Sequence, residues 1–171
     1  MVTAVPTTQI TDRFTVVPSP VDDLILTGDG TALTGCYFSG PGRHDQPAEG
    51  LIRDDAAFAG AVAQLGEYFA GERTEFDLPL APSGTDFQLR VWQQLRTIPY
   101  GTTCSYGDVA AAIGATNGFR AVGLANGRNP ISIIVPCHRV IGANGSLTGY
   151  GGGMERKRFL LDLETGTLPF G

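Results

Sequence analysis

The stretch Ile131-Ser132-Ile133-Ile134-Val135-Pro136-Cys137-His138-Arg139-Val140-Ile141 joins an apolar run to a cluster of reactive side chains. The apolar part is expected to be buried. Pro136 ends it, and a thiol, an imidazole and a guanidinium follow at once. A thiol is a weak nucleophile near neutral pH unless a base, a cation or a helix N-terminus favours its thiolate. Cys137 beside His138 is therefore the first candidate for chemistry, and a buried structural cysteine is the alternative.

Helices are predicted on both sides of this stretch. The pattern T-x-x-Q over residues 85–88 is a capping box, and Ser105 offers a second helix cap. A third, short helix is predicted over residues 119–126, after a glycine-containing turn. Two short helices joined by a tight turn resemble a helix-turn-helix motif, although many helix pairs share that pattern. An amphipathic helix is predicted over residues 154–164, after the glycine-rich loop 142–153.

The N-terminal half has the pattern of a small sheet. Short strands separated by proline and glycine turns are predicted, followed by one amphipathic helix. The expected fold class is α/β (α+β), with a small N-terminal antiparallel sheet and helix and a mostly helical C-terminal domain with a helix-turn-helix. We expect a flexible tail at 1–12, the sheet and helix domain at 13–80, a linker at 81–84 and the helical domain at 85–171.

Composition and charge narrow the function classes. The 171 residues include only 3 Cys and 2 His, with no C-x-x-C pair, so neither a disulfide framework nor a metal site is expected. No apolar run approaches the length of a membrane span, and residues 1–12 lack a signal-peptide pattern, which predicts a cytoplasmic protein without a membrane partner. Residues 1–90 carry 5 Arg against 13 acidic groups, whereas residues 91–171 carry 7 basic against 4 acidic groups. This asymmetry indicates either an anionic partner for the C-terminal half or a solvated basic surface.

The C-terminal half resembles a known family. The pattern PCHRV over residues 136–140 is the signature of the O6-alkylguanine-DNA alkyltransferases, the methylated-DNA–protein-cysteine methyltransferases. The resemblance is strong over residues 85–165 and looser over 13–80. The other family motifs occur in the same order and spacing: Ile98-Pro99-Tyr100-Gly101, Ser105-Tyr106-Gly107, Arg120-Ala121-Val122-Gly123, Gly127-Arg128-Asn129-Pro130 and Thr148-Gly149-Tyr150-Gly151-Gly152-Gly153.

The resemblance implies a monomeric DNA repair protein that acts once and needs no cofactor. It would bind double-stranded DNA containing O6-alkylguanine, and with it O4-alkylthymine, through the minor groove and flip the damaged base out. Cys137 would then take the alkyl group irreversibly. His138 would deprotonate Cys137 through a water, Glu164 would orient His138, and Asn129 would be the hinge before the active-site segment.

The resemblance also implies contacts to the base and to DNA. Arg120 would enter the stack and fill the place of the flipped base, which suits a charged, planar guanidinium. Tyr106 would crowd the target phosphate and hydrogen-bond the base, and Tyr150 would form one wall of the guanine pocket. The substrate-binding candidates are Tyr106, Val140, Tyr150 and Gly151, and the DNA-binding candidates are Arg120, Tyr106, Gly107, Gly118, Phe119 and Arg128.

Each of these residues also has a plain structural interpretation. Tyr106 could pack behind its helix cap, Arg120 could be a surface arginine, and Glu164 could be a solvated acid at a helix end. Arg128 and the basic run 156–158 fit general phosphate contacts or plain surface.

Two features depart from the family pattern. The family usually has two small residues before the arginine, whereas this chain has Gly118 and the bulky Phe119, which either packs inward or changes DNA affinity. Ser132 and Gly151 stand at variable positions, which leaves the size of the accepted alkyl group open. The zinc ligands of some relatives have no matching cluster here, so no metal is predicted.

Three other functions compete with alkyl transfer. A non-catalytic sensor of alkylated guanine on the same scaffold is the runner-up, but such proteins replace the cysteine, and Cys137 is present. A transcription regulator would need an added cysteine-rich metal domain, which 3 Cys do not supply. A thiol hydrolase would turn over an ester or amide, yet the local papain-type cysteine signature is missing.

Overall fold

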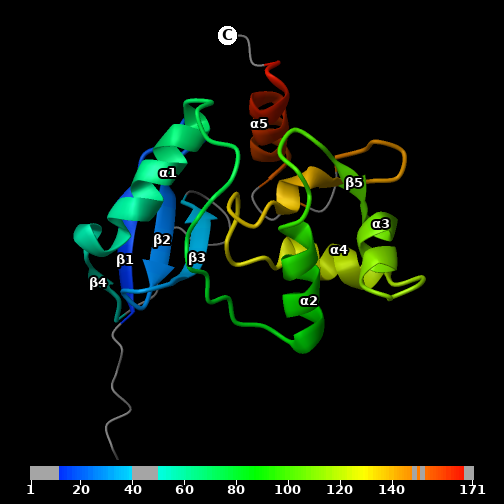
Figure 1. The fold of residues 1–171 in the computed structure, drawn as a ribbon, viewed down its shortest axis with the longest axis horizontal. Coiled ribbons are helices and arrows are strands. Elements are labelled where there is room, and N and C mark those ends of the chain that lie inside the picture. Colours follow the sequence, from blue (N-terminus) through cyan, green and yellow to red (C-terminus); the bar gives the residue numbers. More distant parts are fainter. Residues whose placement is uncertain (1–11, 40–49, 148–149, 151–152, 168–171) are drawn as a thin grey trace, which may run out of the picture.

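The computed structural model describes residues 12–39, 50–147, 150 and 153–167. Its elements form two groups, a sheet with one covering helix and a helical half (Figure 1). The expected fold class is confirmed. The division at residues 81–84 stays a prediction, and the tail at 1–11 lies outside the described residues.

The sheet has four strands in the order β3-β2-β1-β4. The pairs β1–β2 and β2–β3 are antiparallel, as predicted. The short strand β4 adds a parallel pair to β1, which the sequence pattern did not predict. Helix α1 covers the sheet and buries Ala61, Leu65 and Tyr68. The bounds are β1 Arg13–Val17, β2 Leu24–Gly28, β3 Leu33–Phe38, β4 Ile52–Arg53 and α1 Ala59–Phe69, with a 3-10 turn at Asp55–Phe58 before α1.

The helical half contains four α-helices and a two-stranded parallel pair, β5–β6, among the described residues. Both predicted capping boxes are present, at Thr85 with Gln88 and at Ser105 with Asp108. Helices α3 and α4 form the predicted helix-turn-helix. None of the described helices is long and apolar enough to cross a membrane. The bounds are α2 Asp86–Leu95, β5 Cys104–Ser105, α3 Tyr106–Ala112, α4 Phe119–Gly127, β6 Val140–Ile141 and α5 Met154–Thr165.

Helix α2 fixes the orientation of α4. Its face buries Val91, Trp92 and Leu95. The indole Nε1 of Trp92 donates a hydrogen bond of 2.8 Å to the carbonyl oxygen of Ala125 in α4. A buried indole N–H needs such a partner, so this bond locks the angle between the two helices.

The edge of the sheet is joined to the segment that precedes Cys137. The backbone N–H of Cys36 in β3 donates to Pro130 O at 2.9 Å, and Ser132 N–H donates to Cys36 O at 2.8 Å. Ile133 lies between these bonds and the cysteine with φ of 71°, which is unfavourable for a β-branched residue. The N-terminal half therefore helps to hold the active-site segment in a strained path.

Candidate active site

Cys137 lies in a one-turn 3-10 helix, Cys137–Arg139, between the apolar run and β6. The residue is buried, and its carbonyl oxygen accepts a hydrogen bond of 3.2 Å from Asn126 Nδ2. Burial raises the pKa of the Cys137 thiol to about 11, although a hydrogen bond from Asn129 and the charge of Lys157 act in the opposite direction. The resting group is therefore a neutral thiol, and reaction requires a base.

His138 and Glu164 form a fully buried pair. The distance between His138 Nε2 and Glu164 Oε2 is 2.6 Å, and neither side chain is exposed. Burial lowers the pKa of His138 below its usual value, even though the Glu164 carboxylate opposes this shift. Among the described residues His138 Nδ1 has no hydrogen-bond partner. A neutral imidazole that donates from Nε2 presents Nδ1 as a proton acceptor.

Glu164 is held as a carboxylate by several donors. Burial alone would raise its pKa, but the hydrogen bonds and charges of His138 and Arg139 outweigh this effect and hold the pKa at about 2. Arg139 Nε lies 2.8 Å from Oε1, and Gly101 N–H donates to Oε1 at 3.3 Å. Gly101 has φ of 77°, a conformation that favours glycine. The interpretation of Glu164 as a solvated helix-end acid is therefore wrong.

Asn129 bridges the backbone between α4 and Cys137. Its Nδ2 donates to Val135 O at 2.8 Å and to Ile131 O at 3.3 Å, and its Oδ1 accepts from Ile131 N–H at 3.0 Å. One side chain thus closes a loop of backbone that carries the buried apolar run. The role of Asn129 as a hinge stays a prediction.

Lys157 is a functional candidate that the sequence analysis missed. The interpretation of the basic run 156–158 as phosphate contacts or plain surface is wrong for Lys157, which is fully buried. Its Nζ donates to Val140 O at 2.5 Å and lies 6.0 Å from the ring centroids of both Tyr106 and Tyr150. Burial lowers its pKa to about 8, although Cys137 opposes this shift.

A sequence signal for Lys157 existed. Residues 157, 160 and 164 are spaced to share one face of a helix, and Leu160 and Glu164 of this face are also buried. Arg156, one position earlier, is also not plain surface, because its Nη2 lies 2.8 Å from Asp22 Oδ2 in the N-terminal half.

The predicted pocket residues gather around Lys157. Tyr106 begins α3 and is half-buried, whereas Tyr150 is buried and meets Phe38 of β3 edge-on, with 6.5 Å between ring centroids. Val140 is buried and offers its carbonyl oxygen to Lys157. Gly107 is exposed in the first turn of α3. Gly151 lies outside the described residues, so its role in the pocket stays a prediction.

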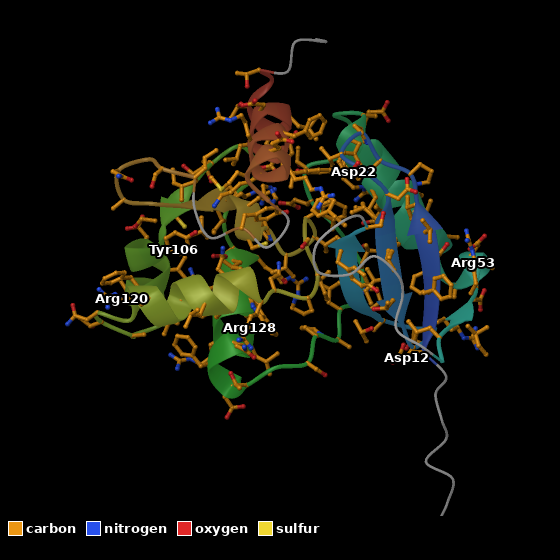
Figure 2. The ribbon with its side chains drawn as sticks, turned by 180° about the vertical axis from the view of Figure 1, so that it is seen from behind. Asp12, Asp22, Arg53, Tyr106, Arg120 and Arg128 are labelled. Carbon is orange, nitrogen blue, oxygen red and sulfur yellow. The ribbon has the colours of Figure 1, made fainter. Side chains whose placement is uncertain are left out.

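The predicted DNA contacts lie on the helix-turn-helix. Figure 2 places Tyr106, Arg120 and Arg128 together on the helical half, away from Arg53 of the sheet. Arg120 is exposed, and its guanidinium lies 5.9 Å from the ring centroid of Phe119. These residues are therefore positioned to meet one ligand surface.

Phe119 and Gly118 open helix α4. Phe119 is 51% exposed, so of the two alternatives for this residue inward packing is wrong. A Cβ at position 118 would come 2.7 Å from Ala115 O, which only glycine avoids. The N-terminal end of α4 thus presents an aromatic ring and a guanidinium side by side.

Comparisons with known proteins give the family. The model of the 6-O-methylguanine DNA methyltransferase DNA-binding domain matches residues 86–166, and the model of the ribonuclease-like domain of the same family matches residues 13–82. The methylated-DNA–protein-cysteine methyltransferase of Mycobacterium tuberculosis is 55% identical over 157 residues, covering 92% of this chain and 94% of the relative. The methylated-DNA–protein-cysteine methyltransferase of Methanosarcina acetivorans is 48% identical over 151 residues, covering 88% of this chain and 97% of the relative.

Solved structures agree with these matches. The crystal structure of M. tuberculosis O6-methylguanine methyltransferase superimposes with a TM-score of 0.86 at 54% identity, covering 94% of this chain and 96% of that one. A crystal structure of M. tuberculosis OGT in complex with DNA superimposes with a TM-score of 0.85 at 55% identity, covering 92% of this chain and 96% of that one. The resemblance seen in the sequence is confirmed: the chain belongs to the 6-O-methylguanine DNA methyltransferase family and is an enzyme of the methylated-DNA–protein-cysteine methyltransferase type.

Proposed function

We propose that this protein repairs O6-alkylguanine in duplex DNA by transferring the alkyl group irreversibly to Sγ of Cys137. The observation that carries the proposal is the buried His138–Glu164 pair directly beside Cys137, with Nδ1 of the imidazole left unpartnered among the described residues. A relative with 55% identity has been crystallised with DNA, which supports DNA as the partner.

The chemistry follows from the state of each group. The Cys137 proton passes to His138 Nδ1, and a water bridges the two because adjacent side chains rarely meet directly. The thiolate attacks the alkyl carbon, a C–S bond forms, and the C–O6 bond breaks with its electron pair going to the guanine. The guanine takes up one proton, so the net reaction moves one proton from the thiol to the base. A thioether is not hydrolysed, so each molecule reacts once.

Two residues support the proton movements. The ammonium group of Lys157 favours the Cys137 thiolate electrostatically. Tyr106 begins α3 with its ring beside Lys157, where its hydroxyl would donate a hydrogen bond to the flipped base as the leaving group develops charge. One proton passes from Cys137 to His138 and one proton is taken up by the guanine, so the reaction is balanced in protons.

The base reaches Cys137 by flipping out of the duplex. Extrusion costs a few kcal/mol, and Arg120 offsets part of this cost by filling the gap. Phe119 extends the same wedge with an apolar ring, as proteins that kink DNA from the minor groove do. The net negative N-terminal half is then expected to face away from the phosphates.

A matched set of cysteine variants tests the nucleophile. Cys137→Ala should abolish transfer of a radiolabelled methyl group from duplex DNA while leaving DNA binding intact. Cys36→Ala and Cys104→Ala remove the other two thiols and should retain transfer. If Cys137→Ala retains transfer and either Cys36→Ala or Cys104→Ala loses it, the nucleophile is the cysteine removed in that variant.

We further infer that the protein acts as a cytoplasmic monomer. All three cysteines are free, which suits a reducing compartment. Sedimentation of the DNA-free protein at micromolar concentration would test the monomer, and a dimer would contradict it.

A further inference from the structure

The N-terminal half reaches the catalytic carboxylate through one side chain. Tyr68 lies in α1, in the half of the molecule opposite α5, and is fully buried. Its hydroxyl donates a hydrogen bond of 2.6 Å to Glu164 Oε2, across 96 positions of sequence. Burial and the charge of Glu164 raise the pKa of Tyr68 well above its usual value, so the hydroxyl stays protonated and donates.

The hydrogen bond from Tyr68 ends on the same carboxylate oxygen that pairs with His138. Glu164 Oε2 receives both Tyr68 Oη and His138 Nε2, each at 2.6 Å. Arg139 Nε and the backbone N–H of Gly101 donate to Oε1, and Arg139 Nη2 also donates to Oε2, at 3.1 Å. Each donor on a carboxylate lowers the negative charge that the oxygen offers to its other partners. Tyr68 therefore both fixes the direction of Oε2 and moderates its pull on the imidazole proton.

We propose that Tyr68 is a positioning residue for alkyl transfer: its hydroxyl, supplied by the N-terminal half, shares Glu164 Oε2 with His138 and so sets the orientation and basicity of the imidazole that deprotonates Cys137. The inference rests on the proposed function, in which His138 is the base. It gives the sheet domain an indirect part in catalysis. Nothing in the sequence pattern around Tyr68, an apolar helix position, indicates this role.

The surroundings of Glu164 contain other charged and titratable groups. Arg139 pairs with the carboxylate, Tyr100 of the turn after α2 lies near enough to feel its charge, and Lys157 of α5 acts on His138. All three remain when only the Tyr68 hydroxyl is removed. A change in the titration of His138 can then be assigned to the loss of the Tyr68 hydroxyl.

The substitution Tyr68→Phe removes the hydroxyl and keeps the ring. Ring contacts with Phe69, Phe76 and Tyr100 have centroid distances of 5.3, 5.4 and 6.1 Å and should persist. Without the donor, Glu164 binds the His138 proton more tightly, so protonation of His138 becomes easier. We expect the imidazole titration to move to higher pH by about one pH unit and the acidic limb of the transfer rate to move with it, so that transfer at a pH below both titrations slows about tenfold.

Imidazole NMR gives this readout without DNA. The chain has only 2 His, so His44 provides an internal reference. Because the NMR titration does not depend on transfer, it distinguishes failure of this inference from failure of the proposed function, which the cysteine variants test. Tyr37→Phe, a hydroxyl deletion in β3 of the same half, is the matched control and should leave both the titration and the rate unchanged.

A double-mutant cycle separates positioning from simple stabilisation. If Tyr68 acts through Glu164, adding Tyr68→Phe to Glu164→Gln should change the rate by less than twofold. In the unaltered protein the Tyr68 hydroxyl proton should exchange slowly and give a downfield NMR signal that Glu164→Gln removes, a measurement that holds even if Tyr68→Phe fails to fold. A His138 titration that is the same in Tyr68→Phe as in Tyr37→Phe, or no protected hydroxyl signal, overturns the inference.

Discussion

Lys157 Nζ lies 2.5 Å from the carbonyl oxygen of Val140, with the whole residue buried beside the active-site cysteine. It is the single lysine of the chain. A buried ammonium group costs desolvation free energy, which is why its pKa falls to about 8. The compensating contacts are the Val140 carbonyl, the faces of Tyr106 and Tyr150, and the developing charge on Cys137.

The first prediction concerns this lysine. Lys157→Met removes the charge and keeps an unbranched side chain, so the pKa of the Cys137 thiol should rise further. In a Cys36→Ala/Cys104→Ala background, the pH at which iodoacetamide alkylation of Cys137 is half-maximal should move upward, and methyl transfer at pH 7.5 should slow about tenfold. An unchanged alkylation profile would show that Lys157 has only a packing role.

The second prediction concerns Arg120. Because its guanidinium is proposed to fill the place of the flipped base, Arg120→Ala should slow transfer from duplex DNA about 10- to 100-fold and slow reaction with free O6-alkylguanine base much less. Arg128→Ala is the control, expected to weaken binding to all sequences and to reduce the salt dependence. Equal losses on duplex and free base would contradict the role of Arg120.

The third prediction concerns Phe119, which is 51% exposed at the start of α4. If the ring enters the minor groove, Phe119→Ala should weaken duplex binding about tenfold and leave the free energy of unfolding unchanged within about 0.5 kcal/mol. Fluorescence anisotropy with a labelled duplex measures the first quantity. A variant that binds duplex as tightly as the unaltered protein would place Phe119 outside the interface.

The fourth prediction concerns stability in acid. The folded-state pKa of Glu164, about 2, lies below its usual value of 4.5, so this group contributes stability above the unfolded pKa that is lost as pH falls from about 4.5 toward 2. Glu164→Gln should make the loss of stability over that range shallower. It should also reduce stability at pH 7 by about 3 kcal/mol, because buried Arg139 loses its partner.

Urea unfolding followed by fluorescence measures this effect. Trp92 is the only tryptophan and is buried between α2 and α4, so its emission reports global unfolding. The same acid dependence in Glu164→Gln and in the unaltered protein would mean that other carboxyl groups govern acid unfolding.

Local patterns in the sequence were sufficient for the α-helices and for strands β1 to β3, but not for the two-residue strands β4, β5 and β6. Capping boxes at Thr85 and Ser105 and the apolar spacing of α2 depend on residues three or four positions apart, and the structure confirms them. The pairing of His138 with Glu164 was predicted from the family resemblance alone. The two residues are 26 positions apart, so no local sequence pattern relates them.

Contacts between the halves could not be predicted in this way. Tyr68 and Glu164 are separated by 96 positions, and Asp22 and Arg156 by 134, so their meeting depends on how the two halves pack. The charge of Lys157 favours a surface position, but its place on the inward face of α5 decides its burial. The spacing of residues 157, 160 and 164 contains that information.

The most direct test of irreversible transfer to Cys137 is the intact mass of the protein after incubation with a duplex that contains one O6-methylguanine. Irreversible transfer predicts a gain in mass of one methylene group per protein, saturating at one and mapped by peptide analysis to Cys137. A mass that does not change despite tight lesion binding, or a methyl group mapped to Cys36 or Cys104, would contradict it.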